Sequence, residues 1–203
     1  MTTTPEAGPT EPRIAPLPVR QRPPQMREAL AALVPPASRH PVPDKGADRP
    51  KALNALGVLA RCPELTRAFN VFNGRLLFAA GLKIRRRELL VLRISALREA
   101  AYEWKRHVWI ARHEAAMADE EIVRVGEGLD APGRSDEERA LLRAVDELIA
   151  DARIADSAWR EPAKVLDERQ LMDVVFGVGA CDTIATAFKT FGVVLDDDLG
   201  GVG

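Results

Sequence analysis

The chain has 203 residues, with 29 Lys and Arg against 30 Asp and Glu, and a formal net charge of -1 at neutral pH. This length favours a single large domain, and the balanced charge argues against an electrostatic grip on nucleic acid or an anionic membrane. We find no apolar run of membrane-spanning length, and the 2 cysteines are too few for a disulfide scaffold. We therefore expect a cytoplasmic protein without nucleic-acid or membrane partners.

The first 50 residues differ in composition from the rest of the chain. They hold 12 of the 15 prolines and lack sustained apolar periodicity. Such a segment buries too little apolar surface to offset the cost of ordering it, so we predict a Pro-rich mobile arm over residues 1–50. One short amphipathic helix is expected near 26–34, ended by Pro35 and Pro36. A lone helix of this length is marginal in water, so we expect it to dock on the domain or on a neighbouring subunit.

From residue 51 to residue 203 the pattern predicts one all-helical domain. Pro63 suits the first position of a helix, and two capping boxes, Ser135 with Glu138 and Asp167 with Gln170, mark the starts of two more. No alternating pattern of strand length is present. The predicted helices cover 51–61, 63–80, 83–98, 102–117, 119–126, 136–152, a brief turn through 159, and 168–191. The expected fold class is all-α.

Three side chains on the two central helices are the candidates for chemistry. Glu103 and His107 are four residues apart on one helix and share a face. Glu88 lies on the preceding helix, which is apolar on nearly every side. If the chain reverses near 99–101, Glu88 and His107 lie about one helical turn apart along their axes. A carboxylate and an imidazole among apolar residues form a candidate proton-transfer unit.

The functional hypothesis assigns one role to each of the three. His107 is the general acid/base because its ordinary pKa lies near neutrality, Glu103 orients it and stabilises its charge, and Glu88 completes the proton path. The alternative is a buried Glu-His-Glu network that only fixes two helices, since structural ion pairs also perturb pKa values. The three side chains could also form a two-carboxylate, one-histidine set for a divalent ion, but the chain has no His-Glu-x-x-His motif, no Cys-rich cluster and no second histidine at ligand spacing. We therefore predict neither a metal nor another cofactor.

Several motifs resemble the carboxymuconolactone decarboxylase family, which includes the alkylhydroperoxidase-D-like proteins. The segment 85–93 is similar to its R-x-x-E-L-x-I-L-R helix, and Tyr102-Glu103-Trp104 with His107 is similar to its Y-E-W-x-x-H element. Residues 138–148, Trp159 and Phe191-Gly-Val193 follow in the family's order, so the likeness spans about 55–195. The resemblance implies an alkylhydroperoxidase-D-like helical bundle. It also implies a small-molecule substrate and a homo-oligomer, either dimer, trimer or hexamer.

The chain departs from the thiol-dependent members of that family. Those members carry a Cys-x-x-Cys motif before the histidine, and in this register Ala100 and Glu103 take the two cysteine positions. A thiol peroxidase needs a thiolate nucleophile, and neither residue supplies one. We expect lyase-like proton transfer on a small organic acid or lactone. The alternatives are a peroxiredoxin-like antioxidant activity through Cys62 or Cys181, and a non-catalytic oligomeric binding protein.

Three further residues are candidates for contact with a substrate. Arg85 suits bidentate binding of a carboxylate, although a solvated helix start is the alternative for this charge run. Trp104 offers an indole platform or, alternatively, a core or subunit contact. Cys181 stands where the family resemblance places a tyrosine. It follows Gly177 and Gly179, a pair that indicates either a close helix–helix approach or a cavity wall.

Overall fold

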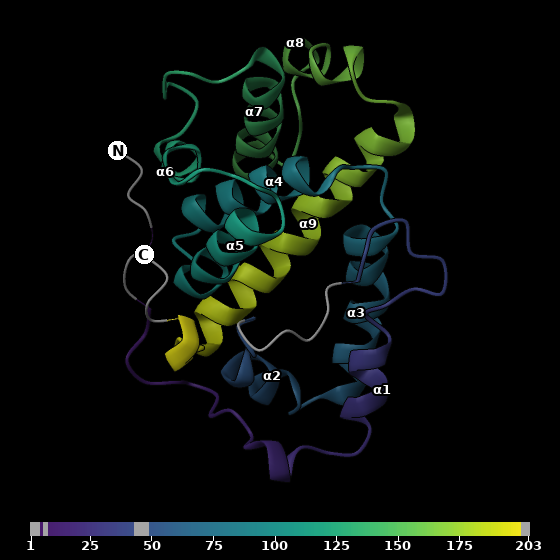
Figure 1. Cartoon of the computed structure of the whole chain (residues 1–203), viewed down its shortest axis with the longest axis vertical. Coiled ribbons are helices and arrows are strands. Elements are labelled where there is room, and N and C mark those ends of the chain that lie inside the picture. The colour runs from purple at the N-terminus through teal and green to yellow at the C-terminus, as the bar shows by residue number, and fades with distance from the viewer. Residues whose placement is uncertain (1–4, 6–7, 43–48, 200–203) are drawn as a thin grey trace.

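The computed structural model describes Pro5, residues 8–42 and residues 49–199, and it is built from helices (Figure 1). No strand occurs in these described parts of the chain, so the all-α prediction is confirmed. The α-helices are α1 (Met26–Ala31), α2 (Leu53–Leu59), α3 (Pro63–Phe78), α4 (Ile84–Leu97), α5 (Ala101–His113), α6 (Asp119–Glu127), α7 (Asp136–Asp151), α8 (Asp156–Trp159) and α9 (Glu168–Phe191).

The helix boundaries follow the local signals in the sequence. Ser135 accepts a hydrogen bond from the backbone N–H of Glu138 at 3.2 Å, and Asp167 accepts one from that of Gln170 at 2.8 Å. Both capping boxes are complete. Pro63 opens α3, and α9 ends at Gly192, whose φ of 69° suits glycine. The helix expected over 102–117 ends earlier, at His113.

Helix α4 is the centre of the bundle and contacts α5, α6, α7 and α9 (Figure 1). One of its faces gives Leu89 and Leu92 to a core cluster with α5 and α6, and another gives Leu90 and Ile94 to a cluster with α7 and α9. Burying each such side chain contributes about 1.5–3 kcal/mol. A helix covered on all sides is apolar all round, which explains the sequence around Glu88.

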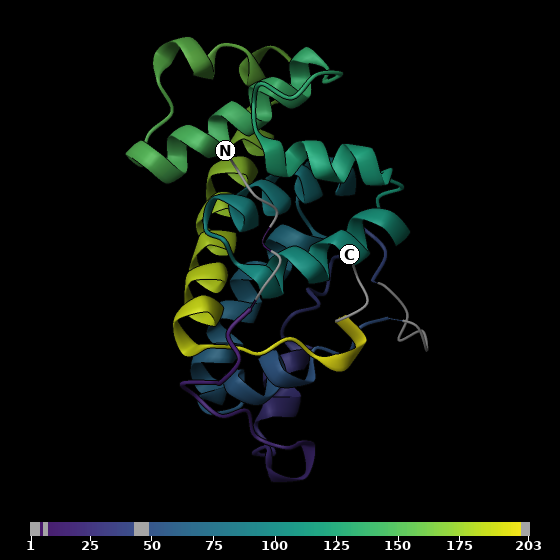
Figure 2. The ribbon, with the colours of Figure 1, turned by 90° about the vertical axis from the view of Figure 1, so that its left-hand side faces the viewer.

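Helix α9 spans 24 residues with a mean hydropathy of 1.5, long and apolar enough by length and composition to cross a membrane. This corrects the expectation that no apolar run reaches that length. The helix is nevertheless packed along α3, α4, α5 and α7 (Figure 2). It also carries ion pairs, from Asp182 to Arg98 and from Asp173 to Arg75. Packing in the bundle covers about a third of its apolar window, and other apolar residues of the helix, such as Met172 and Phe176, are exposed.

The described part of the N-terminal arm, for which a mobile segment is predicted, lies packed on the bundle. The arm runs around the end of the molecule formed by α1, α2 and α3 (Figure 1). Leu17 N–H donates to the carbonyl of Gly57 at 3.0 Å, and the buried Asn70 amide donates to the carbonyl of Ala29 at 2.8 Å. Prolines already limit the freedom of the unfolded arm, so fixing it costs less entropy than its composition suggested.

Helix α1 and residues 32–34, which follow it, lie directly on α3. The expected helix near 26–34 forms over Met26–Ala31, and Met26 and Ala29 are buried. A Cβ atom added at Gly74 of α3 would collide with the carbonyl of Leu33. Gly74 therefore permits a close backbone contact that any larger residue would prevent.

Gly177 and Gly179 fit neither explanation that their sequence context suggests. A Cβ at either position would meet no atom within 4 Å. They lie on an open side of α9 beside the exposed Phe176, which is 51% accessible. The pair neither mediates a close helix approach within the described chain nor lines the large cavity of the bundle.

Candidate active site

Helices α4 and α5 form a hairpin that brings Glu88 to His107. The turn between them places Glu99 at a φ of 50°, and Ala100 N–H donates to the Ser95 carbonyl at 2.8 Å. Counted from the helix ends, Glu88 and His107 differ by three residues of axial rise, about 4.5 Å. The side chains span this offset, and the Nδ1–H of His107 donates to Oε2 of Glu88 at 2.7 Å.

Glu88 is completely buried and both of its oxygens are bonded. The second oxygen, Oε1, accepts from Nε of Arg87 at 3.0 Å, and Nη1 of Arg87 donates to the Leu77 carbonyl at 2.6 Å. Burial opposes the charged form, but His107 and Arg87 outweigh it and hold the pKa of Glu88 below its ordinary value. Glu88 therefore remains a carboxylate at neutral pH.

His107 lies between two carboxylates. Its Nε2 is 3.5 Å from Oε2 of Glu103, on the side opposite the Glu88 contact. Burial disfavours the charged ring, but Glu88 and Glu103 outweigh that effect and raise the pKa of His107 to about 9. At neutral pH the ring is an imidazolium with a proton to give.

A cavity of about 470 Å³ opens beside this cluster, a size typical of small-molecule sites. Glu103, His107 and Arg87 line it, whereas Glu88 lies behind them. The cavity is enclosed by α2, α3, α4, α5, α9 and the described part of the arm, and most of its lining is aliphatic or aromatic. The Nε2 edge of His107 and the Glu103 carboxylate are thus the groups placed to exchange a proton with a bound molecule.

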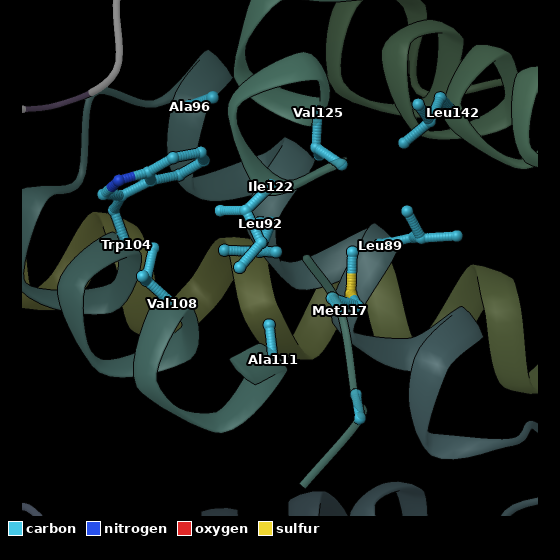
Figure 3. Close-up of a cluster of buried hydrophobic side chains, with 11 residues drawn as sticks. Leu89, Leu92, Ala96, Trp104, Val108, Ala111, Met117, Ile122, Val125 and Leu142 are labelled. Atoms are coloured by element: carbon cyan, nitrogen blue, oxygen red, sulfur yellow. The ribbon is translucent and has the colours of Figure 1, made fainter. Parts of the chain in front are cut away.

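Two expected substrate contacts are absent from the cavity wall. Arg85 instead donates to Glu121 and Glu138, at 2.5 and 3.1 Å, on the far side of α4. Trp104 is 5% exposed and packs in the core between α4, α5 and α6 (Figure 3). Arg85 and Arg87 are two residues apart, about 200° around the helix, so the two side chains face different neighbours and only Arg87 lines the cavity.

The two cysteines lie in different environments. Cys181 lines the cavity, as expected for a substrate contact, and burial together with the charges of Glu103 and Glu88 raises the pKa of its thiol. Cys62 is exposed at the start of α3 and does not line the cavity. A raised pKa lowers the thiolate fraction on which thiol chemistry depends.

Polar residues that the sequence did not single out complete the cavity. Arg49 pairs with Glu114 at 2.9 Å, and its guanidinium lies 5.9 Å from the centre of the Trp109 ring. Arg106 lies beside His107 and also lines the cavity. Glu114 is predictable in part, because it continues the Glu103–His107 face of α5. Arg49 gave no signal, since it precedes the helical domain.

The same residues are poorly suited to binding a metal. Among the described residues, no group of three or more His, Cys, Asp and Glu has an arrangement that could hold a metal ion. Glu88 is already occupied by His107 and Arg87. The arrangement suits proton transfer between side chains and a bound molecule.

The described chain is an all-helical bundle with a buried carboxylate–imidazole pair beside a largely apolar cavity. Residues 63–147 match the model of the carboxymuconolactone decarboxylase family. The chain carries that family's helical segment, and the resemblance found in its motifs is confirmed. No curated protein matches the chain.

Solved structures show the same fold. A protein of unknown function from Agrobacterium tumefaciens, to which an AhpD-type antioxidant role is ascribed, matches with a TM-score of 0.64 and 22% identity, over 68% of this chain and 94% of that one. An alkylhydroperoxidase AhpD-core, peroxidase-related protein from Ralstonia eutropha matches with a TM-score of 0.65 and 20% identity, over 82% and 96%. The debrominase Bmp8 matches with a TM-score of 0.70 and 12% identity, over 92% and 93%. The alkylhydroperoxidase-D-like fold is therefore confirmed.

Proposed function

We propose that this protein is a carboxymuconolactone decarboxylase-like enzyme that transfers protons to and from a small organic acid or lactone, without a redox cofactor. One observation carries the proposal. The buried His107–Glu88 pair, joined at 2.7 Å, lies at the wall of a cavity large enough for a small molecule, with the Nε2 edge of the ring next to Glu103. A buried ionised pair costs desolvation energy, and a role in chemistry accounts for its position at a cavity wall.

The proposed step follows from the charge state of the pair. The imidazolium of His107 donates its Nε2 proton to a substrate atom on which negative charge develops, such as an enolate carbon or a lactone oxygen. The Nδ1 proton stays on His107, which donates it in a hydrogen bond to Glu88, and this bond stabilises the ring in both states. Glu103, at 3.5 Å from Nε2, holds the ring edge in place and is positioned to accept a proton from the substrate.

Solvent-exchange assays test this proposal across a panel of candidate substrates. Organic acids and lactones are incubated with the enzyme in deuterium oxide, and deuterium uptake at carbon is followed by nuclear magnetic resonance. We expect uptake in the wild type and a fall of about 10²–10⁴-fold in His107→Gln, the range of a lost general acid/base. His113→Gln is the matched control, because His113 is exposed and stacks on Trp109 outside the cavity. Equal exchange in His107→Gln and wild type would contradict the role of His107.

A second candidate function is reduction of a hydroperoxide to an alcohol by Cys181, whose thiol is oxidised to a sulfenic acid and is then restored by an external thiol. It is favoured by the position of Cys181 in the wall of the same cavity, and by the antioxidant name of one structural neighbour and the peroxidase-related name of another. The raised pKa of this buried thiol counts against it. Hydroperoxide consumption that disappears in Cys181→Ser, but not in Cys62→Ser, would establish this second function. If neither chemistry is detected, the third alternative, a non-catalytic binding protein, is left.

We also propose that the protein acts in the cytoplasm as a homo-oligomer. An exposed apolar face on α3 and α9 supports the oligomer. Its members are Phe72, Met172, Val175 and Phe176, between 39% and 60% accessible. Phe72 and Phe176 meet edge to face, with ring centres 6.2 Å apart. Such contiguous apolar surface is typical of a subunit interface.

A further inference from the structure

Part of the cavity wall is built by residues that lie outside the segment matching the family. The family match begins at residue 63. Leu33, His40, Pro41 and Arg49 precede that residue and line the cavity. The arm is therefore a part of the binding site and not only a cover for the core.

Backbone contacts hold this part of the arm in position. The backbone N–H groups of Arg39 and His40 both donate to the Phe78 carbonyl, at 2.6 and 3.0 Å. The His40 ring nitrogen Nε2 lies 3.1 Å from the Ala80 carbonyl oxygen. The close approach of Leu33 to Gly74 fixes the other end of the segment. These contacts preorganise the wall before any ligand arrives, which reduces the entropic cost of binding.

The charged side chains at the cavity are unevenly distributed. The positive groups are Arg49, Arg87, Arg106 and His107. The negative groups are Glu103 and Glu114 in the lining, with Glu88 and Asp196 directly behind it, bonded to His107 and Tyr102. Among the described residues, no carboxylate forms an ion pair with Arg106, whose Nη1 lies 3.5 Å from the Pro50 carbonyl oxygen. A partly buried charge without a counter-charge is unfavourable, so this part of the cavity favours a ligand with a negative charge.

Positive charge is concentrated at the end of the cavity where Arg49 and Arg106 lie. Arg87 is bound to Glu88, and the His107 imidazolium lies between Glu88 and Glu103. Glu114 pairs with Arg49, and the Asp196 carboxylate is bonded to the Tyr102 hydroxyl. Burial lowers the pKa of Arg49, and the nearby charge of Arg106 lowers it further. Two neighbouring guanidinium groups are well suited to hold a carboxylate or sulfonate.

We propose that the cavity binds an apolar monoanion, with Arg49 of the arm and Arg106 of α5 holding its anionic group and the aliphatic and aromatic walls holding its body. The apolar monoanion is the substrate class for the proposed proton transfer. Its turnover depends on that proposed function, whereas its binding does not. It also assigns to the arm a binding role beyond the family segment. Binding itself is measurable without turnover.

Two fluorescent probes with the same aromatic skeleton test the proposal. Anilinonaphthalene sulfonate is an apolar monoanion, and phenylnaphthylamine is its neutral counterpart. We expect the wild type to bind the anionic probe at least about tenfold more tightly, because a guanidinium–anion contact is charge-assisted. Decanoate should displace the anionic probe more effectively than decanol does.

Variants locate the anion-binding groups. Arg49→Met and Arg106→Met should each weaken the anionic probe by about tenfold and leave the neutral probe within about twofold. Retained binding of the neutral probe also shows that the variant has folded with its cavity intact. Arg153→Met removes the same charge at an exposed ion pair with Asp156 and should change neither affinity.

Three results would overturn the proposal. The first is equal affinity of the wild type for both probes, and the second is failure of both to bind. The third is loss of the anionic probe in Phe176→Glu but not in Arg49→Met, which would place it on the exposed α9 face. Probe binding and deuterium exchange are measured separately. Anion binding without proton exchange would therefore refute the proposed reaction but support the proposed class of ligand.

Discussion

The carboxylate of Glu88 lies 2.7 Å from the imidazole of His107, across a hairpin of two buried helices. The same carboxylate accepts from Arg87, so one fully buried group joins α4, α5 and the wall of the cavity. The pair stabilises the fold and also sets the charge state of the histidine. Its removal therefore affects both stability and chemistry.

Glu88→Gln keeps the shape of the side chain but removes the charge that balances His107 and Arg87. We expect the free energy of unfolding to fall by about 3–5 kcal/mol, the cost of breaking a buried ion pair. Urea denaturation at neutral pH measures the change. Glu137→Gln is the surface control, since its ion pair with Arg86 is partly exposed and contributes about 0–1 kcal/mol. Equal losses in the two variants would show that the buried pair stabilises the fold no more than a surface pair does.

The stability of the protein should depend on pH through His107. Its folded pKa of about 9 lies above the ordinary value of 6.5, so its contribution is complete below about pH 6.5 and is lost as pH rises through 9. The pKa of Glu88 is shifted down, so its contribution is present above its ordinary value of 4.5 and is lost in acid. Denaturation at pH 6, 7.5 and 9.5 should show falling stability. In His107→Gln this slope between neutral and alkaline pH should be largely absent.

Activity should follow the protonation of the same ring. If His107 donates the proton, the rate is steady around neutral pH and falls as the ring loses its charge near pH 9. A pH–rate profile of the exchange reaction checks this. A rate that instead rises toward pH 9 would show that the neutral ring acts as the base. Glu103→Gln removes one source of the raised pKa and should move the fall to lower pH.

The two thiols should differ in reactivity. Cys62 is exposed, whereas the thiol of Cys181 is buried and its pKa is raised. At neutral pH, iodoacetamide should modify Cys62 at least about tenfold faster than Cys181, because the thiolate is the reacting species. Mass spectrometry of timed digests gives both rates, and unfolding in urea should remove the difference. Rapid labelling of Cys181 in the native protein would instead support the second candidate function, reduction of a hydroperoxide by this thiol.

The apolar face of α3 and α9 should hold a second copy of the chain. Light scattering of the wild type should give the mass of a dimer, trimer or hexamer. Phe176→Glu places a charge at the centre of the face and should yield monomers, since burying an unpaired charge costs several kcal/mol (~3 or more). Val123→Glu is the control on α6, where the replaced side chain is 47% exposed. A monomeric wild type would show that the apolar face of α3 and α9 is not a subunit interface.

The sequence by itself determined the helices and their order. Local signals such as the Ser135 and Asp167 caps act within four residues of their partners, so they can be identified before the fold is known. The Glu103–His107 pair was equally local, since it depends only on the helical repeat. The apolar character of the helix around Glu88 is also visible in the sequence, and the packing of α4 against four other helices accounts for it.

Only the tertiary structure decided what those helices bring together. Arg87 instead of Arg85 turned toward the cavity, and Trp104 joined the core, because each outcome depends on which neighbour covers a given face. The arm gave no periodic signal, yet it packs on α3 and places Arg49 beside the cavity, since contacts made by irregular backbone leave no pattern in sequence. The chain thus predicts the Glu103–His107 pair through short-range geometry. The composition and charge of the cavity beside it come from long-range packing.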